Sequence, residues 1–291
     1  MLKKTGRADT TYIEGETIPS IRYQIFQNIN FVRDGFSTRT GGVSGGQFST
    51  MNFSVKMGDS PENVRKNFEL FTEHHGFKNP VMSDQTHTVN IKRVYREDAG
   101  KNIYIPKDYS DVDGIVTNEK GLTLVTTFAD CVPLYFVDVK NKAIGLSHSG
   151  WKGTIGRIGR NTIAFMNREF GTEPEDIIAA IGPSICVNCY EVSRELAGDF
   201  AQEFHCEITD WELEGIGFDV WDMDKMIYKC NSKYFLNLWA ANYRVLTEAG
   251  VPGKNIALPD LCTCCNEKEL FSHRASKGKR GNLCAFLMIE E

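Results

Sequence analysis

Three short stretches of the chain carry side chains suited to catalysis or metal binding: 83-SDQTHTV-89, 127-TFADCVP-133 and 143-AIGLSHSGWKGT-154. In the first, Gln85 and His87 are two residues apart, so on a strand they would face the same side. In the second, Cys131 follows an acidic residue at the end of an apolar run. In the third, His148 ends a buried strand and precedes a glycine-rich turn, a place where scaffolds often present functional groups.

One cysteine and two histidines form a donor set that suits zinc, because thiolate sulfur and neutral imidazole nitrogen match a borderline-soft cation. Three protein ligands leave a fourth position for water or substrate, which is typical of a catalytic zinc. His87, Cys131 and His148 are far apart in the sequence and would have to converge in the fold. The same residues also allow a different hypothesis, in which a histidine activates the cysteine as a nucleophile.

Other cysteines form two further groups, Cys186-Val-Asn-Cys189 and 262-CTCC-265. Together they suggest a structural zinc site with four thiolates, although the CxC and CC spacings of the second group match the usual pair of CxxC motifs poorly. Buried or partly exposed free thiols are the alternative.

Several polar residues are candidates for binding substrate or phosphate: Arg39, Asn52, Gln85, Lys152 and Arg274. Arg39 and Asn52 bound a glycine-rich polar loop, 39-RTGGVSGGQFSTMN-52, which is a candidate for a flexible rim. A guanidinium or ammonium group suits an anion such as phosphate.

The composition is that of a soluble globular protein, with 41% hydrophobic and 24% charged residues among 291. A net charge of −5 argues against a general nucleic-acid binder. No apolar run is long enough to span a membrane, and no signal peptide is evident, so we expect a cytoplasmic protein. Nine cysteines, an odd number without an export signal, favour reduced thiols over a disulfide framework.

The pattern of the chain predicts strands and helices that do not alternate strictly. We expect strands within 21–38, 81–95, 113–147, 177–182, 269–274 and 283–289, with a hairpin at 138–142. Helices are expected from Pro61 to the stop at Gly76, from a cap at Thr154 to Phe170, over 192–205 and over 232–249. This order predicts an α+β fold in which mixed β-sheets are layered with helices. We expect one domain over 1–291, with an irregular N-terminal segment at 1–20.

Seven stretches in order resemble the YfiH-type laccase-domain family, once described as multicopper polyphenol oxidases. They are FSTRTGGVS (36–44), DQTHT (84–88), TFADCVP (127–133), LSHSGWKGT (146–154), AIGPSICVNCYEV (180–192), DLCTCC (260–265) and FSHR (271–274). The resemblance covers roughly residues 30 to 289. Two departures are Ser149, where many members have Ala, and Lys152, where many have Arg.

The resemblance implies a zinc-dependent purine nucleoside phosphorylase that acts on adenosine, inosine, guanosine and methylthioadenosine and also deaminates adenosine. It places the metal ligands on His87, Cys131 and His148, and the partners would be purine nucleosides and phosphate. It also implies a fold shared distantly with a group of Cys–His toxins. Whether the protein is a monomer or a homodimer stays open.

Three alternatives remain at this point. A copper-dependent polyphenol oxidase would use the same donor set, but six histidines in all are too few for a trinuclear copper site as well. A Cys–His hydrolase would use Cys131 without a metal. A non-enzymatic division or envelope partner would bind the metal without turnover. The resemblance also implies a role in peptidoglycan quality control.

Overall fold

The computed structural model describes residues 2–5, 10–211 and 217–291. Its longer helices are α1 (Pro61–His75), α3 (Ile158–Phe170), α4 (Arg194–Glu203) and α5 (Leu238–Glu248), with a short α2 (Trp151–Ile155). The strands of the first half are β1 (Thr11–Glu14), β2 (Ser20–Tyr23), β3 (Val32–Ser37), β4 (Pro80–Met82), β5 (Ile91–Arg93), β6 (Gly114–Thr117), β7 (Thr123–Phe128), β8 (Val132–Asp138) and β9 (Ala143–Ser149). Those of the second half are β10 (Ile177–Ile181), β11 (Glu191–Val192), β12 (Ile208–Asp210), β13 (Ile227–Cys230), β14 (Lys233–Leu236), β15 (Ile256–Ala257) and β16 (Leu283–Ile289).

The described strands form three sheets. Two have six strands, in the orders β1-β2-β3-β16-β7-β4 and β15-β10-β8-β9-β6-β5, and a smaller one has the order β11-β14-β13-β12. Each is mixed, because antiparallel pairs predominate while β4–β7, β10–β15, β5–β6 and β12–β13 are parallel. The prediction of an α+β fold with mixed sheets is confirmed.

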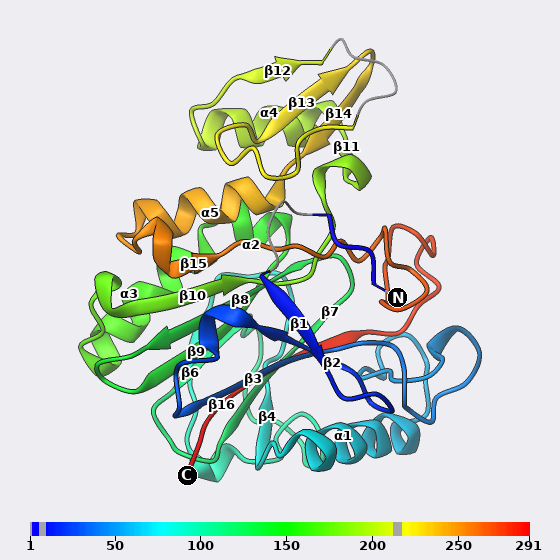
Figure 1. The fold of residues 1–291 in the computed structure, drawn as a ribbon, viewed down its shortest axis with the longest axis vertical. Helices are drawn as coiled ribbons and strands as arrows, with labels where there is room; N and C mark the ends of the chain where they lie inside the picture. The colour runs from blue at the N-terminus through cyan, green and yellow to red at the C-terminus, as the bar shows by residue number, and fades with distance from the viewer. Residues whose placement is uncertain (1, 6–9, 212–216) are drawn as a thin grey trace.

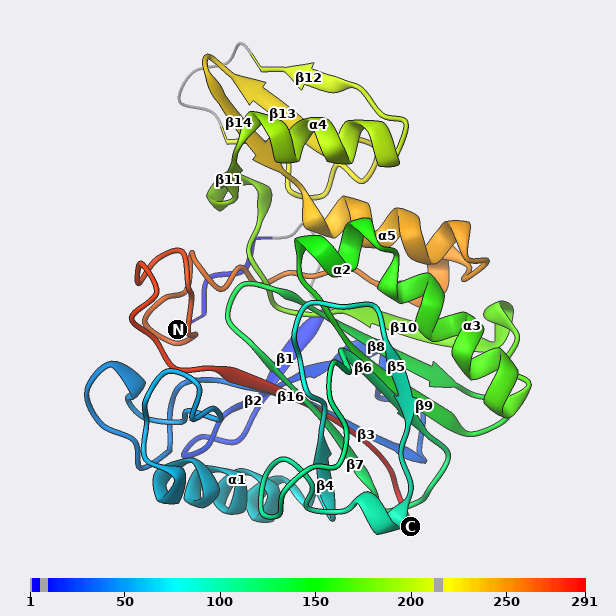
Figure 2. The same ribbon diagram turned by 180° about the vertical axis from the view of Figure 1, so that it is seen from behind.

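The two large sheets pack face to face and are covered by helices on their outer faces (Figures 1 and 2). Their shared interior contains buried residues of both sheets, among them Phe36 and Leu124 of the first and Tyr135 and Leu146 of the second. Helix α1 covers the outer face of the first sheet with Phe68 and Phe71. Helices α3 and α5 cover the outer face of the second.

The small sheet and α4 form a lobe at one end of the molecule (Figure 1). Phe200 of α4 and Leu236 of β14 belong to the same buried cluster as Leu134 of β8 and Val245 of α5. The lobe therefore shares its apolar core with the layered body.

Several local predictions are confirmed. Helix α1 begins after Ser60, whose side chain accepts a hydrogen bond from Glu62 N, and ends at Gly76 with φ 69°. The hairpin at 138–142 joins antiparallel β8 and β9. The C-terminal strand β16 runs through the middle of the first sheet, between β3 and β7.

Other predictions are wrong in instructive ways. Thr154 does not cap a helix, because α2 already begins after Gly150. Arg157, in a left-handed conformation, then separates α2 from α3. The region 232–249 begins with the four-residue strand β14, and the helix α5 starts only after Asn237, the residue that caps it. Residues 269–274 form turns instead of a strand, and β1 lies within the segment predicted to be irregular.

The stretch 81–95 contains two short strands separated by an irregular loop, 83–90. His87 lies in that loop with φ 66°, so the argument that Gln85 and His87 share one face of a strand is wrong. The loop breaks the strand because its backbone N–H groups bind a buried carboxylate, as described below.

Candidate metal centre

The structure brings His87, Cys131 and His148 together from three separate segments. His148 lies near the end of β9, and its neighbour on β8 is Pro133, so Cys131 comes just before the paired strand at the same edge. His87 reaches this point from loop 83–90. One ligand atom from each side chain lies within 4.8 Å of the others, and the rings of His87 and His148 are 4.9 Å apart.

Asp113, the residue before β6, organises this arrangement. Its carboxylate accepts hydrogen bonds from the backbone N–H groups of Thr86 (3.1 Å), His87 (3.1 Å) and Thr88 (2.8 Å). It also lies 2.8 Å from Nδ1 of His148. A single buried carboxylate thus holds the loop of one histidine and orients the ring of the other.

These contacts also set the protonation of the site. Burial by itself would raise the pKa of the Cys131 thiol, but the charge of His148 and hydrogen bonds with His148 and His87 lower that pKa to about 6. Burial would lower the pKa of His148, but Cys131 and Asp113 raise it to about 9. Burial would raise the pKa of Asp113, yet the bond with His148 and the N–H groups of the loop lower it to about 2.

The donor set fits a zinc ion, and copper would accept the same atoms. Because Nδ1 of His148 is committed to Asp113, its Nε2 is the nitrogen left to bind a metal. This carboxylate–histidine pair is the usual support of a metal-binding imidazole, and it raises the basicity of the ligand.

Gly150, the first residue after β9, lets the backbone pass beside His87 and Cys131. A Cβ atom at this position would lie 3.0 Å from Cδ2 of His87 and 3.1 Å from Sγ of Cys131. Any side chain here would push against two of the three ligands. The structural reason for glycine at this turn is therefore contact with the site.

We expect Gly150→Ala to lower zinc affinity about tenfold, because forcing a methyl group into a filled site costs about 1–3 kcal/mol and displaces His87 and Cys131. A chelator competition assay measures this directly. The matched control is Gly198→Ala on α4, where a Cβ meets nothing within 4 Å. That control should leave zinc affinity unchanged and stabilise the helix by about 1 kcal/mol. Equal zinc affinity in the two variants would contradict the proposed steric role of Gly150.

Two adjoining cavities open onto this group: His87 and Cys131 line both, and His148 lines the smaller one. One, of ≈ 330 Å³, includes the aromatic side chains of Trp151 and Tyr190 together with Arg274 in its lining. The other, of ≈ 140 Å³, is more polar and includes Lys56 and Asn282. His87, Ala129, Cys131 and Arg280 line both, so two residues of the trio and one guanidinium lie at the junction.

Arg39 and Asn52 lie outside the lining of these two cavities. The guanidinium of Arg39 donates to the backbone oxygens of Ser49 (2.9 Å) and Glu267 (2.8 Å). Asn52 is buried, and its side-chain oxygen accepts bonds from Ser54 N (3.1 Å) and Asn282 N (2.7 Å). Both residues hold loops in place around the cavities.

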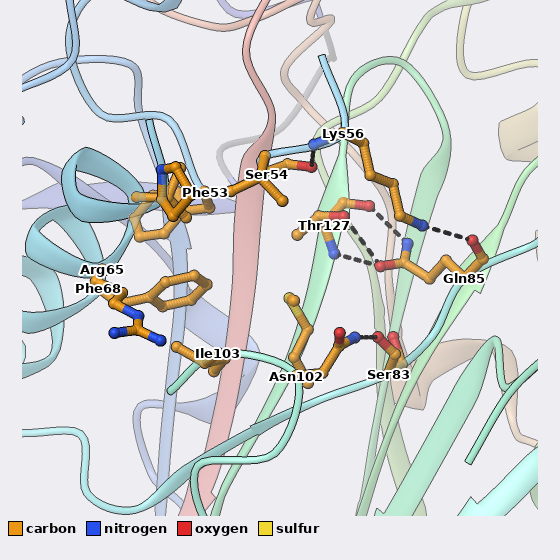
Figure 3. Close-up of a pocket in the computed structure, with 14 residues that line it drawn as sticks. Phe53, Ser54, Lys56, Arg65, Phe68, Ser83, Gln85, Asn102, Ile103 and Thr127 are labelled. Atoms are coloured by element: carbon orange, nitrogen blue, oxygen red, sulfur yellow. Dashed lines mark hydrogen bonds between the residues drawn. The ribbon is translucent and has the colours of Figure 1, made fainter. Parts of the chain in front are cut away.

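Gln85 lines the smaller cavity, but its amide group is paired with β7. Its Oε1 accepts from Thr127 N (2.8 Å) and its Nε2 donates to Thr127 O (2.7 Å). Figure 3 shows this pairing at the border of a neighbouring, mostly apolar cavity of ≈ 230 Å³ beside Phe53 and Phe68. Gln85 therefore fastens loop 83–90 to the sheet.

The two remaining candidates differ in their placement. Lys152 is exposed on α2 with its Nζ 5.5 Å from the ring centroid of Trp151, and it lines neither cavity. Arg274 does line the larger cavity, and its guanidinium donates to Cys189 O (3.1 Å) and Glu191 O (2.8 Å).

Sequence reasoning missed two residues of the site. Asp113 stands directly before a buried strand, and an acid at such a position was the available signal. Arg280 lies in the basic, glycine-flanked run 276-SKGKRGN-282. It lines both cavities together with Cys131. Burial lowers the pKa of its guanidinium, and the nearby Asp130 and Cys131 offset this only in part.

Residues 33–290 match the family model described as "Multi-copper polyphenol oxidoreductase laccase". The chain belongs to this laccase-domain family. The match covers all three metal-ligand candidates, Asp113 and Arg280.

Similarity to named relatives supports the same family assignment. The chain is 32% identical over 275 residues to the purine nucleoside phosphorylase YlmD of Bacillus subtilis, covering 92% of each chain. It is 30% identical over 276 residues to a purine nucleoside phosphorylase of Bacteroides thetaiotaomicron, covering 92% of this chain and 96% of the relative. The crystal structure of YlmD from Geobacillus stearothermophilus superposes with a TM-score of 0.82 at 30% identity, covering 98% of this chain and 100% of the other.

A multi-copper oxidase, as the family description names it, needs more histidine ligands than the described residues bring together. Among the described residues, two groups bring at least three potential ligand atoms together, the trio and a group of four cysteines. Neither is the histidine-rich cluster of a trinuclear copper site. Within the same residues, no helix has both the length and the apolar character needed to cross a bilayer.

Proposed function

We propose that this protein is a zinc-dependent purine nucleoside phosphorylase whose metal is held by His87, Cys131 and His148. The observation that carries the proposal is the convergence of these three residues, backed by Asp113, beside an aromatic and a more polar cavity that share His87 and Cys131. Relatives named purine nucleoside phosphorylases support the reaction class. Adenosine, inosine, guanosine and methylthioadenosine are the proposed substrates.

The two cavities suit the two halves of such a reaction. Trp151 and Tyr190 offer aromatic surface for a purine in the larger cavity. Arg280 is the proposed phosphate-binding residue, because it lies at the junction and its buried Nε has no partner among the described side chains and backbone. Lys56 lines the polar cavity and adds a second positive charge.

In phosphorolysis a phosphate oxygen bonds to C1′ of the ribose while the bond from C1′ to the purine nitrogen breaks. The purine leaves with the electron pair and takes up a proton, and ribose 1-phosphate is the other product. A bound zinc would supply a positive charge that polarises oxygen or nitrogen atoms of the reactants. Arg280 holds phosphate against the ribose, and the aromatic walls orient the purine and exclude water.

Arg280→Ala should lower kcat/KM for phosphate about 10- to 100-fold, because a hydrogen bond to a charged group is worth about 1.5–3 kcal/mol. Steady-state kinetics with varied phosphate at saturating inosine would measure this. Lys152→Ala, which removes an exposed charge outside both cavities, is the control and should change little. Zinc content should stay the same in both variants. A larger loss in Lys152→Ala than in Arg280→Ala would overturn the assignment of the phosphate site.

The proposed activity is tested by product analysis. Purified protein of known zinc content is incubated with adenosine, with and without phosphate, and the products are separated by chromatography. Adenine and ribose 1-phosphate that form only with phosphate establish phosphorolysis. Inosine would establish the deamination that we also propose for this site. If zinc-loaded protein formed none of these products, the nucleoside assignment would be refuted.

A Cys–His hydrolase is the second candidate, and one observation favours it. The lowered pKa of Cys131 beside His148 is what a nucleophilic thiol requires. This mechanism predicts activity that survives metal removal and is destroyed by alkylation of Cys131.

A further inference from the structure

Four cysteines outside the trio gather between two loops. Cys186 and Cys189 follow β10, and Cys262 and Cys265 follow β15, and their four sulfur atoms lie within 4.8 Å of one another. The two segments run side by side, joined by a parallel bridge between Ser184 and Cys262. In Figure 2 the segment that leads into β11 and the orange segment that follows β15 run close together.

The poor match of the CxC and CC spacings in 262–265 to a zinc site is resolved by the structure. The ligands in the second group are Cys262 and Cys265, which form a CxxC motif, and Cys264 is not part of the cluster. The chain therefore contributes two CxxC motifs, the usual pattern of a structural tetrathiolate site. Sγ of Cys262 accepts hydrogen bonds from the backbone N–H groups of Cys186 (3.3 Å) and Cys265 (3.4 Å), as thiolate ligands do.

The spacing of the sulfurs indicates a single ion. With a Zn–S distance of about 2.3 Å, the sulfurs of a tetrahedral site are about 3.8 Å apart, which agrees with a group held within 4.8 Å. Sγ of Cys189 lies 3.5 Å from Sγ of Cys265, too far for a disulfide bond of about 2.05 Å.

We propose that Cys186, Cys189, Cys262 and Cys265 bind a second, structural zinc ion. This proposal goes beyond the nucleoside reaction and does not depend on it. The zinc would join two loops that build the wall of the larger cavity. Tyr190 follows one ligand directly, and Arg274 donates to the backbone oxygen of Cys189.

The same loops are also tied to the catalytic metal ligand. The carboxylate of Asp130, the residue before Cys131, accepts hydrogen bonds from Thr263 Oγ1 (2.6 Å) and Arg274 N (2.7 Å). Thr263 lies between the ligands Cys262 and Cys265. A zinc ion at this place would fix the position of the cavity wall relative to Cys131.

Zinc counting by mass spectrometry tests the site. Protein purified under reducing conditions without chelator should contain two zinc ions per chain, and Cys189→Ser/Cys265→Ser should contain one. Cys264→Ser, which changes a neighbouring cysteine outside the cluster, is the matched control and should keep two. The proposal fails if the double variant keeps the zinc content of the unaltered protein, or if the unaltered protein holds a single zinc that Cys131→Ala removes.

A measurement on the unaltered protein decides the matter even if the double variant does not fold. Cys265 is exposed and Cys189 partly so, yet zinc should protect both from alkylation. Removing the metal with a chelator should raise their alkylation rates at least tenfold, as followed by peptide mass spectrometry. Rapid alkylation of Cys265 before chelation, or a Cys189–Cys265 disulfide in protein kept under reducing conditions, would overturn the proposal.

Discussion

Replacing Cys131 with alanine is expected to abolish turnover and to remove one zinc ion per chain while the fold is kept. The thiol is a metal ligand candidate whose partners, His87 and His148, cannot hold a catalytic zinc tightly by themselves. Losing a supporting residue of a metal site already costs about 10- to 100-fold in affinity or activity, so losing a ligand should cost about 100-fold or more. Kinetics and zinc content, measured on the same preparation, check this.

Cys206→Ala is the control for this experiment, because Cys206 is partly exposed after α4 and belongs to neither metal-ligand group. It should keep full activity and the full zinc content. Circular dichroism and thermal unfolding should show that both variants are folded. Full turnover in Cys131→Ala on a nucleoside would show that the site has been placed wrongly.

Asp113→Asn should weaken zinc binding about 10- to 100-fold, which is the usual cost of removing the partner of a metal-binding histidine. The amide keeps the shape of the carboxylate but loses one acceptor. It therefore cannot accept from the loop N–H groups of Thr86 and Thr88 and also hold His148. Competition with a chromogenic chelator measures the change in affinity.

Asp111→Asn is the matched control. Asp111 is exposed, precedes Asp113 by two residues, and accepts a hydrogen bond from the Thr86 hydroxyl instead of contacting the trio. Its φ of 55° also suits asparagine. Zinc affinity should be unaffected in this control. If Asp113→Asn bound zinc as tightly as Asp111→Asn, the buried carboxylate would not be the support of His148.

The sequence predicted that His87, Cys131 and His148 converge better than it predicted the route by which they meet. His148 was expected at a strand end, and the structure places it there. His87 was expected on a strand, but its loop is held by Asp113 through three backbone hydrogen bonds, a tertiary contact that periodicity cannot reveal. Similarly, β14 and α5 looked like one helix, because apolar residues in a short strand followed by a helix give an ambiguous pattern.

The candidate substrate-binding residues were harder to predict, because charge alone does not reveal where a side chain points. Arg39 and Lys152 carry the expected charges, yet one binds backbone oxygens of two loops and the other faces solvent. Arg280 was passed over in a basic run that resembles an ordinary exposed turn. Only the fold shows that its guanidinium is partly buried beside Cys131.

The most direct test of the central claim is turnover before and after metal removal. Phosphorolysis of inosine is measured on the isolated protein, on protein stripped of metal by a chelator, and on stripped protein given zinc or copper. We expect no turnover without metal, recovery with zinc, and no recovery in Cys131→Ala. Full turnover in the stripped protein would contradict the metal mechanism. If alkylation of Cys131 then abolished that turnover, the result would favour a cysteine nucleophile.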